Sequence, residues 1–327
     1  MKTTEMEKEW LRRVAGGIRP QKQDKESSAP KEVRKSPESP SPEKDKGFKD
    51  VAGMDSLKKF VTESFVNVLK NRDCADMYGI KPPSMLFYGP AGCGKTFFAE
   101  KMAEEVGIHF MKIVPDDLAC TWVHGTQQKI GEVFRTAERK GPTLLFFDEF
   151  DAMVSRRTGN ADNQHYDGEV NEFLCMLNNA SERGIYVVAA TNHPERIDRA
   201  VLRTGRIDEM VYIDMPDMEA RRSLFQLALS KLPAEDDMDL TRLATLTEGY
   251  NCSDIRYIVK SAARKMFNLT IEKNDGVVRK VTQNLLEETI KGKSPSVSGR
   301  ELREYERVRS EFSPKDEHSM PTTVGFR

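Results

Sequence analysis

Short apolar runs alternate with longer amphipathic stretches along the middle of the chain. The runs are continuous, as expected of strands buried on both faces, and lie at 85–88, 110–114, 144–147, 185–190 and 210–213. The stretches between them have apolar residues at helical spacing and include 97–105, 129–138 and 169–178. Buried strands joined by helices are typical of a parallel sheet with helices on both faces. The pattern therefore predicts an α/β domain over residues 48–216.

A different pattern follows residue 216. No further strand run of that kind appears, and the amphipathic stretches predict helices at 218–232, 240–247, 253–267 and 283–291. Asn251 and Asp254 have the spacing of a helix capping box. We expect a small all-helical domain at 217–292, followed by a C-terminal helix and tail at 293–327.

The first 47 residues differ from the rest of the chain. Segment 21–47 mixes both charges with four prolines, and its only apolar members are Ala29 and Val33. Such a segment cannot bury enough surface to offset the entropy of ordering. We expect residues 1–47 to be a disordered, charged tail and linker. The apolar residues around Trp10 indicate either a short docking helix or a frayed terminus.

The composition narrows the class of protein. The 327 residues include 51 basic and 52 acidic side chains, so no global basic excess favours nucleic acid or a membrane surface as partner. No apolar run is long enough to span a membrane, and the start lacks the apolar region of a signal peptide. We therefore expect a cytoplasmic location. The five cysteines are scattered and odd in number, which indicates reduced thiols.

Residues 89–96, Gly-Pro-Ala-Gly-Cys-Gly-Lys-Thr, match the phosphate-loop pattern G-x-x-x-x-G-K-[ST]. The glycines let successive N–H groups point at phosphate oxygens, and the following helix adds its positive N-terminal end. Lys95 would reach the β- and γ-phosphates, and the Thr96 hydroxyl would bind Mg²⁺. The alternative is a glycine-rich turn that happens to end in Lys-Thr, but the strand before the motif and the helix after it favour a nucleotide. The predicted nucleotide-binding residues here are Pro90, Ala91, Gly92, Cys93, Gly94, Lys95, Thr96 and Phe97.

Two adjacent carboxylates end the apolar strand at 144–147. Asp148 would hold Mg²⁺ through its water shell, and Glu149 would polarise the hydrolytic water as general base. A solvated acidic turn is the alternative, but the phosphate loop about fifty residues earlier disfavours it. The fold class predicted is that of a P-loop NTPase, with its parallel sheet between helices and a small helical lid domain after it.

With these motifs placed, the chain resembles the AAA ATPases, in the group that includes FtsH-type and katanin- or spastin-type motors. The resemblance runs from Phe48 to about Phe312. It implies binding of ATP with Mg²⁺ and hydrolysis to ADP and phosphate. Residues 48–53 resemble the segment whose backbone contacts the adenine edge in this family. The residues expected at the adenine edge are Asp50, Val51 and Ala52.

Two further motifs of the family lie between the apolar runs at 185–190 and 210–213. Residues 190–194 resemble sensor 1, in which Asn192 would bridge the γ-phosphate and the water; a plain turn at a strand end is the alternative. Residues 198–208 resemble the second region of homology, in which Arg203 and Arg206 would reach the γ-phosphate of the neighbouring subunit. A pair of surface arginines in salt bridges is the alternative. Fingers that act in trans imply a homo-oligomeric ring, most often a hexamer in this family.

The helical domain also carries a motif of the family. Residues 248–255 resemble the segment that closes over the base, but Cys252 and Ser253 stand where the family usually has Gly-Ala. We expect these side chains to lie at the adenine and to crowd it. Near the C-terminus, Tyr305 and Phe312 resemble residues of a terminal helix that packs back on the ring, and we assign them no chemistry.

Residues 119–124 align with the first pore loop of the family. Trp122, Val123 and His124 would grip a polypeptide at the axis of a ring, because an aromatic side chain binds extended chains without regard to sequence. A buried core role for Trp122 is the alternative. His124 stands where the family has glycine. Residues 156–165 are polar and contain glycine, as expected of a second pore loop.

The function favoured by these features is an ATP-driven ring that remodels or unfolds protein substrates. An ATP-gated scaffold or adaptor with weak hydrolysis is the alternative, and a nucleic-acid motor is disfavoured by the near-zero net charge. The histidines include no His-Glu-x-x-His pair, so no zinc peptidase of the FtsH type is expected in this sequence.

Overall fold

The computed structural model describes six stretches of the chain: 47–119, 125–154, 164–198, 200–203, 205–275 and 277–312. Backbone contacts divide the chain into units at Met1–Ser41 and Pro42–Arg327, and every described residue belongs to the second. The predicted linker, the Trp122 pore loop and most of the second pore loop lie outside the described residues. Side chains at 125, 164–170 and 312 also lie outside them.

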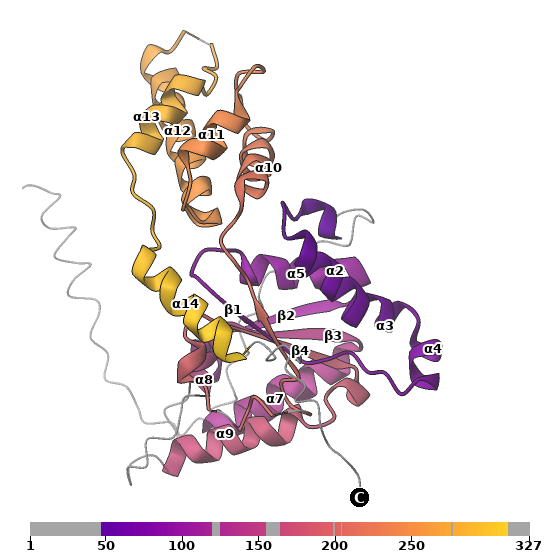
Figure 1. Ribbon diagram of the computed structural model, residues 1–327. Coiled ribbons are helices and arrows are strands. Elements are labelled where there is room, and N and C mark those ends of the chain that lie inside the picture. The colour runs from indigo at the N-terminus through magenta and orange to yellow at the C-terminus, as the bar shows by residue number, and fades with distance from the viewer. Residues whose placement is uncertain are drawn as a thin grey trace, which may run out of the picture. The chain divides into compact units, whose positions relative to one another are not determined.

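A parallel sheet of five strands forms the centre of the α/β domain (Figure 1). Its strands are β1 (Met85–Tyr88), β2 (His109–Ile113), β3 (Thr143–Phe147), β4 (Ile185–Thr191) and β5 (Glu209–Tyr212). The strand order is β2-β3-β4-β1-β5, and every pairing is parallel. The predicted sheet is confirmed, with strand limits that differ by at most one residue at either end.

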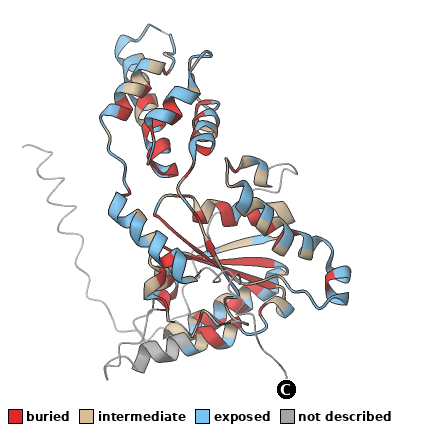
Figure 2. Ribbon diagram, in the orientation of Figure 1, coloured by how far each residue is buried: buried red, intermediate tan, exposed pale blue. Residues whose placement is uncertain are grey.

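Burial along the strands explains their sequence pattern. Every residue of β1, β3 and β4 is buried, because these strands occupy the interior of the sheet and helices cover both faces (Figure 2). The edge strands β2 and β5 are only partly buried. An edge strand packs against one neighbour alone, so it can carry polar residues such as Lys112.

Helices cover the two faces of the sheet, and Figure 1 shows α2, α3 and α5 on one side and α7, α8 and α9 on the other. The first side carries η1 (Gly47–Asp50), α2 (Asp55–Val61), the π-helix η2 (Thr62–Val66), α3 (Asn67–Lys70), α4 (Arg72–Met77) and α5 (Lys95–Val106). The second carries α6 (Pro115–Leu118), α7 (Gly125–Lys140), α8 (Phe150–Met153) and α9 (Gln164–Leu177). Short 3-10 turns η4 (Ser181–Arg183) and η5 (Pro194–Arg196) flank β4.

Alternate strand residues belong to the two separate hydrophobic clusters on these faces. Met85 and Phe87 pack in one cluster with Phe98 of α5. Leu86, between them in sequence, packs in the other with Phe134 of α7. This period of two is what a strand buried on both faces requires.

The helical domain has a hydrophobic cluster of its own, which includes Phe225, Leu243, Ile258 and Leu286. Its helices are α10 (Met218–Leu229), α11 (Leu240–Leu246), α12 (Cys252–Lys273) and α13 (Gln283–Lys291). Helix α12 runs six residues beyond its predicted end, because no glycine or proline interrupts it before the left-handed Asn274. We propose 216–217 as the boundary between the two domains.

A last helix, α14 (Gly299–Phe312), follows the helical domain. Ser298 caps its start, because its hydroxyl accepts from the Glu301 N–H over 3.3 Å; the same hydroxyl donates to the Glu301 carboxylate over 2.8 Å. Among the described residues, no helix has both the length and the apolar character needed to cross a membrane.

Candidate functional site

The phosphate loop joins β1 to α5 and depends on two glycines in left-handed conformation. Gly89 has φ +142°, and a Cβ there would lie 2.2 Å from the Ile213 oxygen beside it. Gly92 has φ +77°, and a Cβ there would lie 2.7 Å from Nδ2 of Asn251 in the helical domain. No side chain fits at either position, so the sequence pattern of the loop follows from its close approach to both neighbours.

Lys95, the first residue of α5, folds back onto the loop that precedes it. Its Nζ donates to the backbone oxygens of Gly89 and Pro90 over 2.7 and 2.9 Å. The residue is 8% exposed, and burial lowers the pKa of Lys95 to about 8. The ammonium is therefore already held inside the loop in which the sequence predicts phosphate binding.

Thr96 and Asp148 bring hard oxygen atoms together, as a Mg²⁺ site requires. The Thr96 hydroxyl donates to Oδ2 of Asp148 over 3.1 Å, although the two residues are 52 positions apart in sequence. A hydroxyl beside a carboxylate suits Mg²⁺, which prefers oxygen ligands and keeps several waters. These residues therefore fit the metal that the sequence predicts.

A lysine that the sequence analysis missed contacts the same carboxylate. Lys112 of β2 places its Nζ 2.7 Å from Oδ2 of Asp148. The other oxygen, Oδ1, accepts from the backbone N–H of Glu149 over 3.1 Å. The signal in the sequence was a lone charged residue inside an otherwise apolar strand run, 110–114.

Glu149 follows Asp148 in a strained backbone conformation. Its φ of +51° lies in the left-handed region, where residues other than glycine are uncommon. The residue precedes α8 and is exposed. Strain of this kind persists only where the surrounding structure fixes it, and it is frequent at active sites. The strained turn presents the Glu149 side chain to solvent next to the carboxylate of Asp148.

Asn192 follows β4 and holds a buried acceptor without a partner among the described residues. Its Oδ1 is buried and accepts no hydrogen bond, which is costly unless another molecule supplies a donor. The residue before it is fixed, because the Thr191 hydroxyl donates to Oδ1 of Asp151 over 2.6 Å. Asp151 thus ties the end of β4 to the acidic turn after β3, a role that the sequence analysis did not assign.

Comparison with known proteins agrees with this geometry. The profile of the family described as "ATPase family associated with various cellular activities (AAA)" matches residues 85–215, which run from the start of β1 to just beyond β5. The chain belongs to the AAA ATPase family. The predicted family is therefore confirmed.

Two relatives place this AAA chain among longer proteins. A "Cell division cycle protein 48 homolog" of Archaeoglobus fulgidus is 32% identical over 277 residues, which make up 81% of this chain and 38% of that protein. A "Putative cell division cycle ATPase" of Plasmodium falciparum is 30% identical over 226 residues, 68% of this chain and 18% of that protein. The AAA chain therefore spans well under half the length of either relative.

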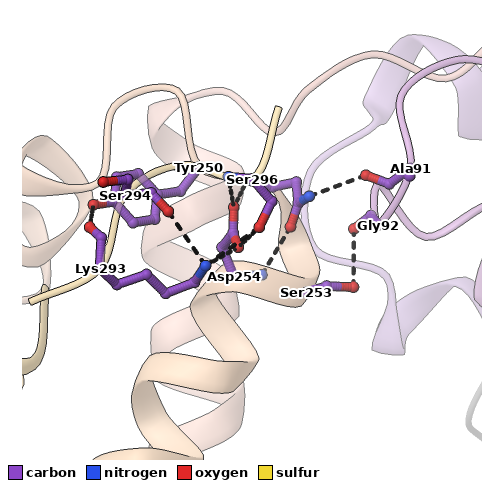
Figure 3. A network of polar contacts seen from close by, with 9 residues as sticks. Ala91, Gly92, Tyr250, Ser253, Asp254, Lys293, Ser294 and Ser296 are labelled. Atoms are coloured by element: carbon purple, nitrogen blue, oxygen red, sulfur yellow. Dashed lines mark hydrogen bonds and ion pairs between the residues drawn. The ribbon is translucent and has the colours of Figure 1, made fainter. Parts of the chain in front are cut away.

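The AAA helical domain contacts the backbone of the phosphate loop (Figure 3). Asn251 donates from Nδ2 to the Ala91 oxygen over 3.0 Å, and the Ser253 N–H donates to the Gly92 oxygen over 3.1 Å. The Cys252 thiol donates to the Cys93 oxygen over 3.6 Å. Cys252 and Ser253 therefore donate hydrogen bonds to backbone oxygens of the phosphate loop. Their contact with adenine stays a prediction.

Asp254 joins this helix start to the segment before α14 (Figure 3). The side chain is 3% exposed and lies 2.7 Å from Nζ of Lys293. It also accepts from the Ser296 N–H and hydroxyl over 3.0 and 2.5 Å. Burial acts to raise the pKa of Asp254, but the hydrogen bonds from Lys293 and Ser296 outweigh it and hold the pKa below its usual value.

Helix α14, which follows this segment, contacts Asn192, the predicted sensor 1 residue. The Tyr305 hydroxyl donates to the backbone oxygen of Asn192 over 2.7 Å. A cavity of about 160 Å³ lies between these parts, and its lining includes Pro90, Ala91, Asn192, Asn251, Ser296 and Tyr305. Tyr305, to which the sequence analysis assigned no chemistry, is half-buried and touches the site.

The segment predicted to contact adenine packs against α5. Val51 is 6% exposed, and Asp50 lies 3.2 Å from Nζ of Lys101. Two cations lie over the ring of Phe97 of α5: Lys101 Nζ is 5.6 Å and Arg256 Cζ 5.3 Å from the ring centre. Arg256 comes from α12, and the sequence analysis did not single it out.

The predicted arginine fingers lie on the loop between β4 and β5. Arg203 is exposed. Arg206 is half-buried and donates from Nη1 to the Ala200 oxygen of its own turn over 2.7 Å. Their action on a neighbouring subunit stays a proposal.

Proposed function

We propose that this AAA chain hydrolyses Mg–ATP to ADP and phosphate. One observation carries the proposal: the predicted site residues follow the carboxyl ends of the adjacent strands β1, β4 and β3. They are Lys95, Thr96, Asp148, Glu149 and Asn192. Parallel α/β sheets bind ligands at this edge.

Each side chain has a distinct role in this mechanism. The loop N–H groups and Lys95 bind the phosphates, and Thr96 and Asp148 would hold Mg²⁺, which would supply positive charge against the phosphates. Glu149 takes a proton from the attacking water as general base. The buried Oδ1 of Asn192 accepts a hydrogen bond from that water and so orients it.

The hydrolysis proposal is tested with Glu149→Gln. The amide keeps the size of the side chain but cannot take the proton, so we expect ATP binding to persist and phosphate release to fall at least about 100-fold. Binding is measured by equilibrium titration and release by a coupled phosphate assay. Equal phosphate release by Glu149→Gln and the wild-type chain would overturn the role of Glu149.

We propose further that the active species is a homo-oligomeric ring, most simply a hexamer, in the cytoplasm. Arg203 and Arg206 of one subunit would complete the site of the next, since an arginine finger stabilises the charge that develops in phosphoryl transfer. The exposure of Arg203 supports this role. The ring would remodel or unfold protein substrates.

Trp122, Val123 and His124 form the proposed grip of the ring on a polypeptide. The test is Trp122→Ala, which should keep ATP turnover and lose substrate processing. Trp10→Ala is the matched control, because Trp10 is the only other tryptophan and lies in the N-terminal tail. Unchanged processing by Trp122→Ala would refute the pore.

One contact favours an ATP-gated scaffold as a second candidate. The Lys112 ammonium contacts Oδ2 of Asp148, beside which the metal would bind, and weak metal binding would slow hydrolysis. A phosphate release rate no higher than that of Glu149→Gln, with ATP binding intact, would favour this candidate.

A further inference from the structure

Lys112 reaches Asp148 because of the register of the sheet. Strand β2 is an edge strand and pairs in parallel with β3, so that Lys112 lies opposite Phe146, two residues before Asp148. The Lys112 side chain is 41% exposed and that of Asp148 is 22% exposed. The pair is therefore open to solvent on the lysine side.

Three groups among the described residues contact the Asp148 carboxylate. Oδ1 accepts from the Glu149 N–H, and Oδ2 accepts from the Thr96 hydroxyl and contacts the Lys112 ammonium. A Mg²⁺ ion held by the Thr96 hydroxyl and, through its water shell, by Asp148 would lie close to Oδ2, the oxygen that Thr96 and Lys112 both contact. Two cations close to one oxygen repel each other, so the ammonium disfavours the metal unless it moves away.

We propose that Lys112 is a tethered cation that competes with Mg²⁺ for Asp148. It thereby raises the Mg²⁺ concentration that the nucleotide site requires, and it stabilises the Asp148 carboxylate when no metal is bound. The inference rests on the proposed function, because it takes Thr96 and Asp148 as the metal ligands. A lysine suits this role, since its flexible stem lets the ammonium move into solvent.

The test measures Mg²⁺-dependent binding of a fluorescent ADP analogue to the full chain. Lys112→Met removes the charge and keeps the length of the side chain, so we expect half-maximal binding at about two- to fivefold less Mg²⁺ than the wild-type chain needs. Lys112→Arg keeps a cation and should stay close to the wild-type value. Circular dichroism verifies that both variants fold, and Lys112→Gln serves as a second neutral variant.

Lys81→Met is the matched control. Lys81 also lies 2.7 Å from a carboxylate, that of Glu182, and is 60% exposed, but it touches no residue of the predicted site. Lys81→Met removes the same charge as Lys112→Met and should leave unchanged the Mg²⁺ concentration needed for nucleotide binding. A shift as large as that of Lys112→Met would mean a general charge effect and would overturn the proposal.

A second measurement does not depend on nucleotide. Without metal, Lys112→Met should unfold at a lower temperature than the wild-type chain, because Asp148 loses its counter-charge. Added Mg²⁺ alone should raise the unfolding temperature of Lys112→Met more than that of the wild-type chain. An equal Mg²⁺ requirement in both assays would refute the competition.

The outcomes separate this inference from the proposed function. Normal Mg²⁺-dependent binding with the expected shift, but hydrolysis no faster than Glu149→Gln, would support the role of Lys112 and overturn the ATPase. Hydrolysis faster than that of Glu149→Gln, with the same Mg²⁺ requirement in Lys112→Met and the wild-type chain, would support the ATPase and overturn the role of Lys112. If no variant bound nucleotide, both proposals would fall.

Discussion

Tyr305 fixes the backbone of Asn192 through a hydrogen bond from its hydroxyl. Burial raises the pKa of Tyr305 to about 12, so the hydroxyl remains a donor across the working pH range. Tyr305→Phe keeps the ring and removes this bond. We expect the kcat for ATP to fall about two- to tenfold, with KM little changed, because the loss acts on the residue that orients the water.

Steady-state kinetics with Tyr305→Phe distinguish positioning from a general structural role. Tyr78→Phe is the control, since Tyr78 is 77% exposed. A rise in KM together with a large fall in unfolding temperature would indicate that Tyr305 only stabilises the fold.

For single residues, the sequence motifs predicted which side chains belong to the nucleotide site but not which other side chains contact them. Lys95, Thr96 and Asp148 belong to patterns whose spacing alone indicates their chemistry. Tyr305 lies 113 positions from Asn192, and Lys112 reaches Asp148 only through the pairing of β2 with β3. Neither contact has a local signature, so only the tertiary structure reveals it.

The start of helix α12 contacts the backbone of the phosphate loop through hydrogen bonds from Asn251 and Ser253. Gly92→Ala would place a Cβ 2.7 Å from Asn251 Nδ2 at a φ of +77°. We expect weaker ATP binding and a free energy of unfolding lower by about 2 kcal/mol, because the left-handed strain and the clash add. Equilibrium unfolding in urea measures this change.

Gly79→Ala is the matched control for that prediction. Gly79 has a similar φ of +66°, but nothing lies within 4 Å of its Cβ position. It should show the strain alone, and the double variant Gly92→Ala, Asn251→Ala should recover part of the loss. Equal losses for Gly92→Ala and Gly79→Ala would show that the helical domain does not touch the loop in solution.

Asp254 stabilises the same element in a pH-dependent way. Its pKa in the folded chain is lower than the ordinary 3.8, so its stabilisation is complete above that value and is lost as pH falls below it. We expect Asp254→Asn to lower the free energy of unfolding by about 3 kcal/mol at pH 7, because it leaves Lys293 without its carboxylate. The difference from the wild-type chain should shrink at pH 3.

Urea unfolding at both pH values tests this prediction. Asp275→Asn serves as control, because Asp275 pairs with Arg279 over 2.7 Å at an exposed position and should have a much smaller effect. A difference between Asp254→Asn and the wild-type chain that stayed constant from pH 7 to pH 3 would refute the charge-based explanation.

The sequence pattern predicted the presence of strands and helices better than the residues at which they begin and end. Apolar runs mark β1, β3 and β4 because these strands are buried on both faces. The π-helix at Thr62–Val66 was missed because no change of period announces it. The last six residues of α12 were missed although Asn274, which ends the helix, is a residue type that often caps helices.

The whole molecule is proposed to act as a ring. The fold and family account for a nucleotide site in each chain, and the exposed Arg203 supports completion of that site by a neighbour. Arg203→Ala should therefore bind ATP normally and hydrolyse it at least about 1,000-fold more slowly. Mixing it with Glu149→Gln should restore some activity if the finger acts in trans, because some interfaces then pair an intact Glu149 with an intact Arg203. No recovery on mixing would argue that Arg203 acts within its own chain.

The most direct test of the central claim is the ATPase rate per chain as a function of protein concentration. Glu149→Gln provides the blank. We predict a rate that rises with concentration and then levels off, because assembly completes each site. A rate that never exceeds the blank at any concentration would contradict the proposal that this AAA chain is an ATPase.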